Sequence, residues 1–250
     1  ESLTTNQLGS KSVAVGQGTL SNQNPATAAD MYNVGVGFNA GANVSTGIQN
    51  TLIGGLAGDA LTVGGTNVAV GVSALGADTL GSSSVAIGSS ALRLQNFTTA
   101  TDVFNVAIGR AAGENVTTGI NNVLIGGEAG DALTDADFNI AIGKGALGTD
   151  TLGSSSIAIG EGALLNQNFT TATATYNVAI GHAAGNQITT GEENTLIGGL
   201  AGDALTTSNY NTALGSGALG LDDLGSFTTA IGRAALSSQN YSTATNSHNT

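Results

Sequence analysis

The chain has 250 residues, 39 of them glycine, no cysteine, 9% charged residues and a formal net charge of -12. The acidic balance leaves no basic patch that could neutralise phosphates, which excludes nucleic acid as a partner. No polybasic segment or run of about 18 apolar residues is present, so we expect no membrane insertion, and without cysteine there are no disulfides or thiolate metal sites.

The chain begins with residues that have no signal-peptide character, so we expect any export signal to lie outside this sequence, or export to use another route. Residues 1–11 precede the first recognisable repeat, and we predict that they form a lead-in or cap. Residues 12–250 are predicted to form one continuous repeat domain.

A short motif that closes with glycine recurs thirteen times in this domain. One long rung and three short ones alternate in a fixed order that occurs three times, so four rungs make one super-repeat, delimited by Gly16, Gly88, Gly160 and Gly232. Glycine at this density disfavours helix by about 1 kcal/mol per site relative to alanine. The sequence therefore predicts an all-β fold, a parallel β-solenoid (β-roll) of about 13 rungs of 17 or 21 residues.

The residues of each motif alternate in character. The first is Val or Ile in nine rungs and Thr in four, and the third is aliphatic in all thirteen. Because side chains alternate across a strand, these two positions share one face, which we predict to be the core. The middle residue should then point outward, and in no rung is it polar.

An outward apolar stripe of this kind indicates an oligomer interface, since identical copies carry the same ladder. A homotrimer around a common axis is the simplest closure, and the alternative is a small-residue face that merely tolerates water. The predicted interface consists of Leu52, Ala69, Ala86, Ala107, Leu124, Ala141, Ala158, Ala179, Leu196 and Ala213.

Three further positions are nearly constant from rung to rung. Each rung opens with Asn, Ser or Thr, whose side chain is expected to hydrogen-bond to its own and neighbouring turns. The closing glycine indicates a positive φ or a close backbone approach. Three residues later lies an alanine in every rung but the first, which predicts a tightly packed corner.

Every fourth rung carries four extra residues that include an aromatic ring flanked by amides and hydroxyls. We expect these loops to protrude along one edge and to make weak multivalent contact with a cell-surface polysaccharide. In the alternative, the ring packs back and caps the core. The candidate binding residues are Gln95, Asn96, Phe97, Thr98, Gln167, Asn168, Phe169, Thr170, Gln239, Asn240 and Tyr241.

Catalytic chemistry has no basis in the sequence. His182 and His248 are the only histidines; we expect the first to be a variable surface residue and the second to replace a ring. No Ser-His-Asp set or carboxylate pair emerges, so we predict a protein that is not an enzyme and uses no cofactor. Asp59 and its repeats are expected to cap turns rather than bind calcium, and a second acidic column at Asp78 and its repeats to be solvated.

The motif resembles known repeats. Residues 84–88 (Ser-Val-Ala-Ile-Gly) resemble the head repeat of trimeric autotransporter adhesins, and residues 177–185 resemble repeats of phage tail-fibre proteins. The resemblance covers about residues 12–250, although these rungs are longer than those of adhesin heads. It implies a left-handed β-roll, assembled as a trimer, in an extracellular, cell-surface or virion-associated fibre that serves host attachment.

Three functional classes follow. The first is a rigid shaft or head segment of an adhesive fibre. The second is a structural filament or surface-layer subunit that polymerises end to end. The third is an ice-binding solenoid, which would need a flat threonine array on every rung; pairs such as Thr117-Thr118 do not recur that way.

Overall fold

The computed structural model describes residues 1–250 and contains 21 short β-strands. The chain divides into two compact units, residues 1–122 (unit 1) and residues 123–250 (unit 2). No helix in the structure has the length and apolar character needed to cross a membrane.

Unit 1 contains one long parallel sheet and two short strand pairs. The strands of the long sheet are, in order, β2 (Val13–Val15), β4 (Val34–Val36), β5 (Thr51–Ile53), β6 (Val68–Val70), β8 (Val85–Ile87) and β10 (Val106–Ile108). The short pairs are β1 (Gly9–Ser10) with β3 (Ala29–Asp30), and β7 (Gly81–Ser82) with β9 (Thr101–Asp102). Pairing is in register, so that middle residues such as Leu52 and Ala69 lie side by side.

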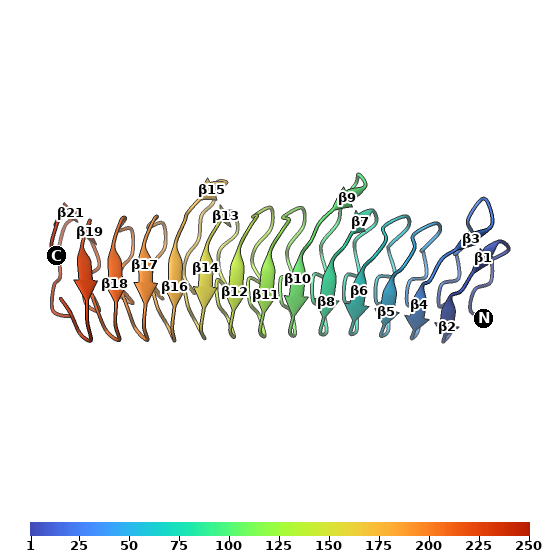
Figure 1. Cartoon of the computed structure of the whole chain (residues 1–250), viewed down its shortest axis with the longest axis horizontal. Coiled ribbons are helices and arrows are strands. Elements are labelled where there is room, and N and C mark those ends of the chain that lie inside the picture. Colours follow the sequence, from blue (N-terminus) through green and yellow to red (C-terminus); the bar gives the residue numbers. More distant parts are fainter. The chain divides into compact units, whose positions relative to one another are not determined.

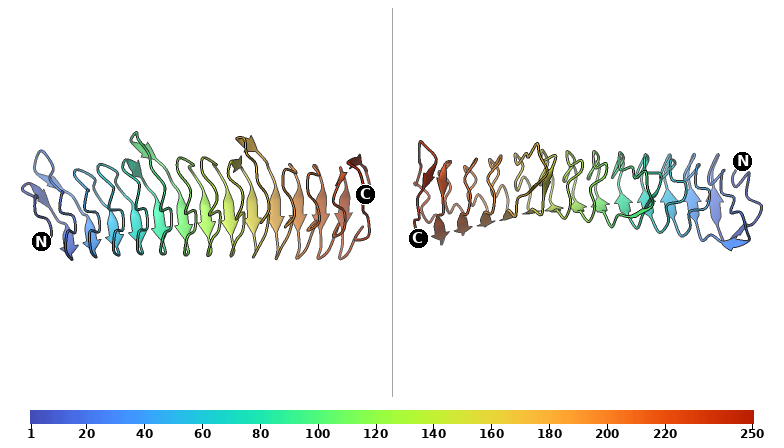
Figure 2. Two further views of the ribbon diagram at one scale, coloured as in Figure 1. Left: turned by 180° about the vertical axis from the view of Figure 1, so that it is seen from behind. Right: turned by 90° about the horizontal axis from the view of Figure 1, so that it is seen from above.

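Unit 2 repeats this arrangement. Its long sheet consists of β11 (Val123–Ile125), β12 (Ile140–Ile142), β14 (Ile157–Ile159), β16 (Val178–Ile180), β17 (Thr195–Ile197), β18 (Thr212–Leu214) and β20 (Thr229–Ile231). The short pairs are β13 (Gly153–Ser154) with β15 (Thr173–Ala174), and β19 (Gly225–Ser226) with β21 (Thr245–Asn246). In each unit the long strands form one side of the coil, and the segments around β9 and β15 project beyond the neighbouring turns (Figures 1 and 2).

These strands confirm an all-β parallel β-solenoid, in which most turns repeat at the shorter of the two predicted spacings. Residues 1–11 belong to the turn that precedes β2, because the Leu3 amide donates to the Thr19 carbonyl at 3.1 Å and the Gly18 amide donates to the Glu1 carbonyl at 3.0 Å. One continuous domain over residues 12–250 stays a prediction.

The predicted inside and outside of the long sheet are reversed in the structure. The middle residues of the strands face the core of their own chain, whereas Val15 is 57% exposed and Ile231 66% exposed. The predicted interface is therefore wrong, because residues buried in the core of one chain cannot line a contact between chains. Every residue of the predicted interface has no exposed surface: Leu52, Ala69, Ala86, Ala107, Leu124, Ala141, Ala158, Ala179, Leu196 and Ala213.

The reason for the reversal is volume complementarity across a narrow core. A Cβ added to Gly41 would lie 2.5 Å from Cδ1 of Leu52, and one added to Gly58 would lie 2.7 Å from Cδ2 of the same side chain. Leu52 thus fills the space left by glycines on its own turn and on the preceding one. In seven of the nine rungs whose middle residue is alanine, the position that corresponds to Gly58 carries a leucine, such as the buried Leu92 in the rung of Ala86; the rungs of Ala107 and Ala179 have glycine there.

The closing glycine is confirmed as a position that no side chain could occupy. Its φ lies between +120° and +141° in all thirteen rungs. A Cβ on Gly54 would also lie 2.5 Å from the carbonyl oxygen of Gly71 in the next turn. Both predicted causes, a positive φ and a close backbone approach, therefore hold together.

The asparagines that open the rungs form a buried ladder, as predicted. The Asn67 backbone amide donates to Oδ1 of Asn50 at 3.0 Å, and Nδ2 of Asn50 donates to the Gly64 carbonyl at 3.0 Å. Asn211 and Asn194 make the same contact in unit 2, also at 3.0 Å. Each asparagine thereby links its turn to the next one.

Candidate interaction surfaces

The outer face of the long sheet is an apolar surface, formed by the first and third residues of each three-residue strand. These side chains are Val, Ile, Leu or, in four strands, Thr. Ile87 and Ile108 on neighbouring strands of unit 1, and Leu214 in unit 2, are exposed to solvent. A contiguous apolar surface of this kind marks a site of interaction. This surface, and not the middle residues, is the apolar face of the sheet that is open to solvent.

A second surface, which we call the ring column, runs beside the outer face. It consists of the residue that immediately precedes each rung-opening Asn, Ser or Thr. In unit 1 it contains Lys11, Tyr32, Gln49, Thr66, Ser83, Phe104 and Asn121; in unit 2 it contains Phe138, Ser155, Tyr176, Glu193, Tyr210, Phe227 and His248. All have φ between +49° and +65°, a region that is unusual for aromatic residues.

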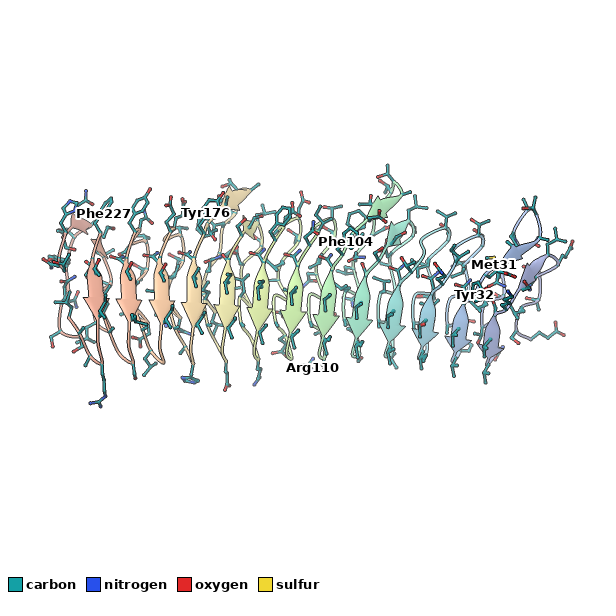
Figure 3. All side chains as sticks on the ribbon, in the orientation of Figure 1. Met31, Tyr32, Phe104, Arg110, Tyr176 and Phe227 are labelled. Atoms are coloured by element: carbon teal, nitrogen blue, oxygen red, sulfur yellow. The ribbon has the colours of Figure 1, made fainter.

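The rings of this column point to solvent and stack where they are adjacent. The ring centroids of Tyr210 and Phe227 are 4.8 Å apart, and those of Phe227 and His248 are 5.1 Å apart. His248 therefore does replace a ring, as the sequence indicated. Figure 3 shows Tyr176 and Phe227 at the edge of the unit where the strands begin.

The phenylalanines of the long rungs pack inward rather than outward. Phe97 is 7% exposed and Phe169 5% exposed, and the preceding Gln95 and Gln167 have no exposed surface. This burial removes these four residues from the predicted polysaccharide contact, because the ring covers the core as in the alternative interpretation.

The other candidate residues of these loops remain accessible. Their contact with a polysaccharide stays a prediction. These residues are Asn96, Thr98, Asn168, Thr170 and Asn240, which are exposed, and Gln239 and Tyr241, which are half-buried.

A buried polar cluster explains why each loop carries glutamine. Oδ1 of Asp78 accepts from the amides of Gly81 and Phe97 at 3.0 and 3.2 Å, and its Oδ2 accepts from Nε2 of Gln95 at 2.6 Å. Oε1 of Gln95 in turn accepts from Asn105 at 2.9 Å. The expected solvated acidic column is therefore wrong: these carboxylates are buried and hold the loop to the core.

The same cluster recurs once in each of the following super-repeats. Gln167 donates to Asp150 at 2.6 Å, and Gln239 donates to Asp222 at 2.5 Å. This cluster can be recognised in the sequence, because an aspartate precedes each of these glutamines by the length of one short rung.

Charged side chains border one open groove on the turns. An open groove of about 330 Å³ in unit 2 is bordered by Lys144, Glu161 and His182, and His182 is exposed. No group of three or more His, Asp or Glu side chains is placed to hold a metal ion. Comparison with protein-family models, with curated proteins and with solved structures found no match.

Proposed function

We propose that the chain is a rigid, non-enzymatic shaft or head segment of an extracellular, cell-surface or virion-associated adhesive fibre, and that it assembles as a homotrimer. The observation that carries this proposal is the apolar outer face of the long sheet. The resemblance of the Val-Ala-Ile-Gly motif to adhesin-head and tail-fibre repeats supports it, and it leads us to expect a left-handed coil.

The outer face supports self-association because its composition does not suit water. On a sheet with one solvated face, the outward positions would be mostly polar. Here Val68 and Val70 of one strand, and Val85 and Ile87 of the next, present aliphatic groups in register. Two further copies repeat these groups at the same spacing, so the three faces can cover one another around a common axis.

A fibre role also fits the backbone. Every turn is joined to the next by short hydrogen bonds, for example 2.8 Å from the Gly71 amide to the Ile53 carbonyl. Within each unit, this bonding holds successive turns in fixed register, which suits a spacer that presents adhesive surfaces. An ice-binding role is less well supported, since threonine occupies the first outward position in only four strands.

The solution mass tests this proposal. Size exclusion with light scattering should give three times the monomer mass of 24.3 kDa. A concentration-independent monomer would contradict the trimer. A mass that grows with concentration without limit would favour the end-to-end filament instead.

A further inference from the structure

A second column of variable residues lies at the opposite end of the strands from the ring column. We call it the end column; it consists of the residue that directly follows the closing glycine of each rung. Three of the five Lys and Arg residues of the chain lie in it, together with His182. In unit 1 it contains Gln17, Phe38, Gly55, Val72, Ser89 and Arg110; in unit 2 it contains Gly127, Lys144, Glu161, His182, Gly199, Ser216 and Arg233.

The two columns vary together along the sequence. Each Lys, Arg or His of the end column follows an aromatic residue of the ring column by six positions, and the seven rungs without a ring have no such residue there. The pairs are Phe104 with Arg110, Phe138 with Lys144, Tyr176 with His182 and Phe227 with Arg233. Within one chain the strand separates the members of a pair, as Figure 3 shows for Phe104 and Arg110 at opposite ends of β10. A contact that couples them must therefore involve another copy of the chain.

In unit 2 the end column borders the open groove of about 330 Å³. Lys144, Glu161 and His182 line this groove from three successive turns, and Leu165 and Ala183 add apolar surface to it. The groove thus combines apolar walls with the heads of long or flat side chains, which is a suitable environment for an aromatic ring.

On the same three turns the ring column carries Phe138, Ser155 and Tyr176. Phe138 is 58% exposed and Tyr176 60% exposed, although both hold a positive φ that is unfavourable for an aromatic residue. Ser155 leaves the turn between them without a ring, so a side chain of a partner can enter from the side and lie on a ring face. These two rings therefore have the exposure and the spacing to contact something outside the chain.

We propose that copies of the chain lie parallel and level, rung beside rung, and that Phe138 and Tyr176 of one copy pack in the groove at Lys144 and His182 of the next. This arrangement places each ring beside the residue with which it varies. It also places the Ser155 hydroxyl beside Glu161, whose carboxylate can accept its hydrogen bond. The inference rests on the proposed fibre, in which the outer faces turn toward a common axis, and it names the contacts between neighbouring copies.

Charge favours the parallel arrangement over an antiparallel one. At the ring-column edge of unit 2, Glu193 lies in the column, and Asp137 and Glu192 directly precede column residues, with no Lys or Arg among them. The end column of unit 2 carries Lys144 and Arg233 against one glutamate. Copies that run in the same direction around an axis bring the acidic edge of each beside the basic edge of the next. Antiparallel copies bring like edges together, where like charges repel.

Cysteine cross-linking tests the arrangement, because the chain has no cysteine of its own. Ser83 of the ring column and Ser89 of the end column lie on one rung, and cysteine resembles serine in size. The test variant is Ser83→Cys with Ser89→Cys, treated with a short bismaleimide and examined on a denaturing gel. The matched control is Ser83→Cys with Gln17→Cys, which moves the second thiol by four rungs, roughly 19 Å along the stacking direction.

We expect covalent trimers from Ser83→Cys with Ser89→Cys, and monomers from the control pair and from each single cysteine variant. Covalent dimers from a single variant would show that like edges meet, and would overturn the parallel arrangement. Cross-linking of the control pair, but not of the test pair, would overturn the level one. Light scattering on the same samples separates the two proposals: a trimer without cross-links removes the column contact and leaves the fibre, whereas a monomer removes the fibre itself.

Replacement of the rings tests their place in the groove. Phe138→Asn with Tyr176→Asn suits the positive φ of both positions, and we expect the concentration at half-dissociation to rise at least about tenfold. Thr98→Asn with Thr170→Asn, on exposed parts of the long rungs, is the control and should leave the assembly unchanged. Equal dissociation of the ring variant and the unaltered chain would overturn the contact between rings and groove.

Discussion

At the scale of single residues, Leu52 and Ile53 are neighbours with opposite environments, since Leu52 is fully buried and Ile53 exposed. We predict that Leu52→Ala lowers the free energy of unfolding by about 2–5 kcal/mol, because it opens a cavity between two glycines that cannot fill it. Ile53→Ala should cost less than about 1 kcal/mol in the isolated chain. Urea unfolding measures both, and a larger loss for Ile53→Ala would restore the orientation predicted from the sequence.

Gly54 and Gly55 are likewise adjacent but differ in the room around them. A Cβ on Gly54 would lie 2.5 Å from a backbone carbonyl, whereas one on Gly55 would have nothing within 4 Å. We predict that Gly54→Ala destabilises the fold by several kcal/mol, well above about 1 kcal/mol, while Gly55→Ala is close to neutral. Thermal unfolding followed by circular dichroism distinguishes the two, and equal midpoints would contradict the close packing of turns.

We expect Asp59 to make the stability of the fold depend on pH. Desolvation by partial burial raises the pKa of Asp59 above its ordinary value, against a hydrogen bond to its own backbone that lowers it. Its ionised form is therefore less favourable in the folded state, and stability falls as pH rises from the unfolded to the folded pKa. We predict that Asp59→Asn raises the melting temperature at pH 7 and that this gain disappears once the pH is below the unfolded pKa.

Asp30 is the control of opposite sign. Its pKa is lowered by the hydrogen bond from Lys11, 2.7 Å away, so Asp30→Asn should give no gain at pH 7. A rise in melting temperature of similar size for both variants would show that net charge, rather than burial, is the cause.

At the scale of elements, the long rung depends on its buried polar cluster. Gln95→Leu would leave the buried Asp78 carboxylate without its closest donor, and we predict a loss of roughly 1–3 kcal/mol in the free energy of unfolding. Thr98→Ala, on the exposed part of the same loop, should change stability by less than about 0.5 kcal/mol. Chemical unfolding tests the pair. Unchanged stability of Gln95→Leu would mean that the loop is held by Phe97 alone.

The elements themselves could be predicted from the sequence, but their orientation could not. Three features of the sequence each fit only one structural arrangement, and all three arrangements are present in the structure. These features are the fixed order of long and short rungs, the closing glycine and the asparagine ladder. The Val-Ala-Ile motif is apolar on both faces, so alternation alone assigns neither face to the core. The orientation of the strands follows only from the packing of Leu52 against Gly41 and Gly58, which lie on two different turns.

At the scale of the whole molecule, the repeat indicated a solenoid, whereas the interaction surfaces depended on which face lies outside. The ring column could not be predicted from the sequence for a similar reason. Its members Tyr32, Phe104 and Tyr176 were visible as a repeat, but their exposure follows from a positive φ that no simple alternation predicts. The loop residues showed the reverse: Phe97 was predicted to be accessible, but it is 7% exposed, and its backbone amide donates to the buried Asp78 carboxylate.

The proposed function requires that copies of the chain meet through the outer face of the long sheet. The most direct test is the solution mass of Ile87→Lys with Ile108→Lys, which places two charges on that face, against Val72→Lys, an apolar and more exposed position outside it. We predict a trimer for the unaltered chain and for Val72→Lys, and a monomer for the double variant. A double variant that keeps the trimer mass would contradict the claim.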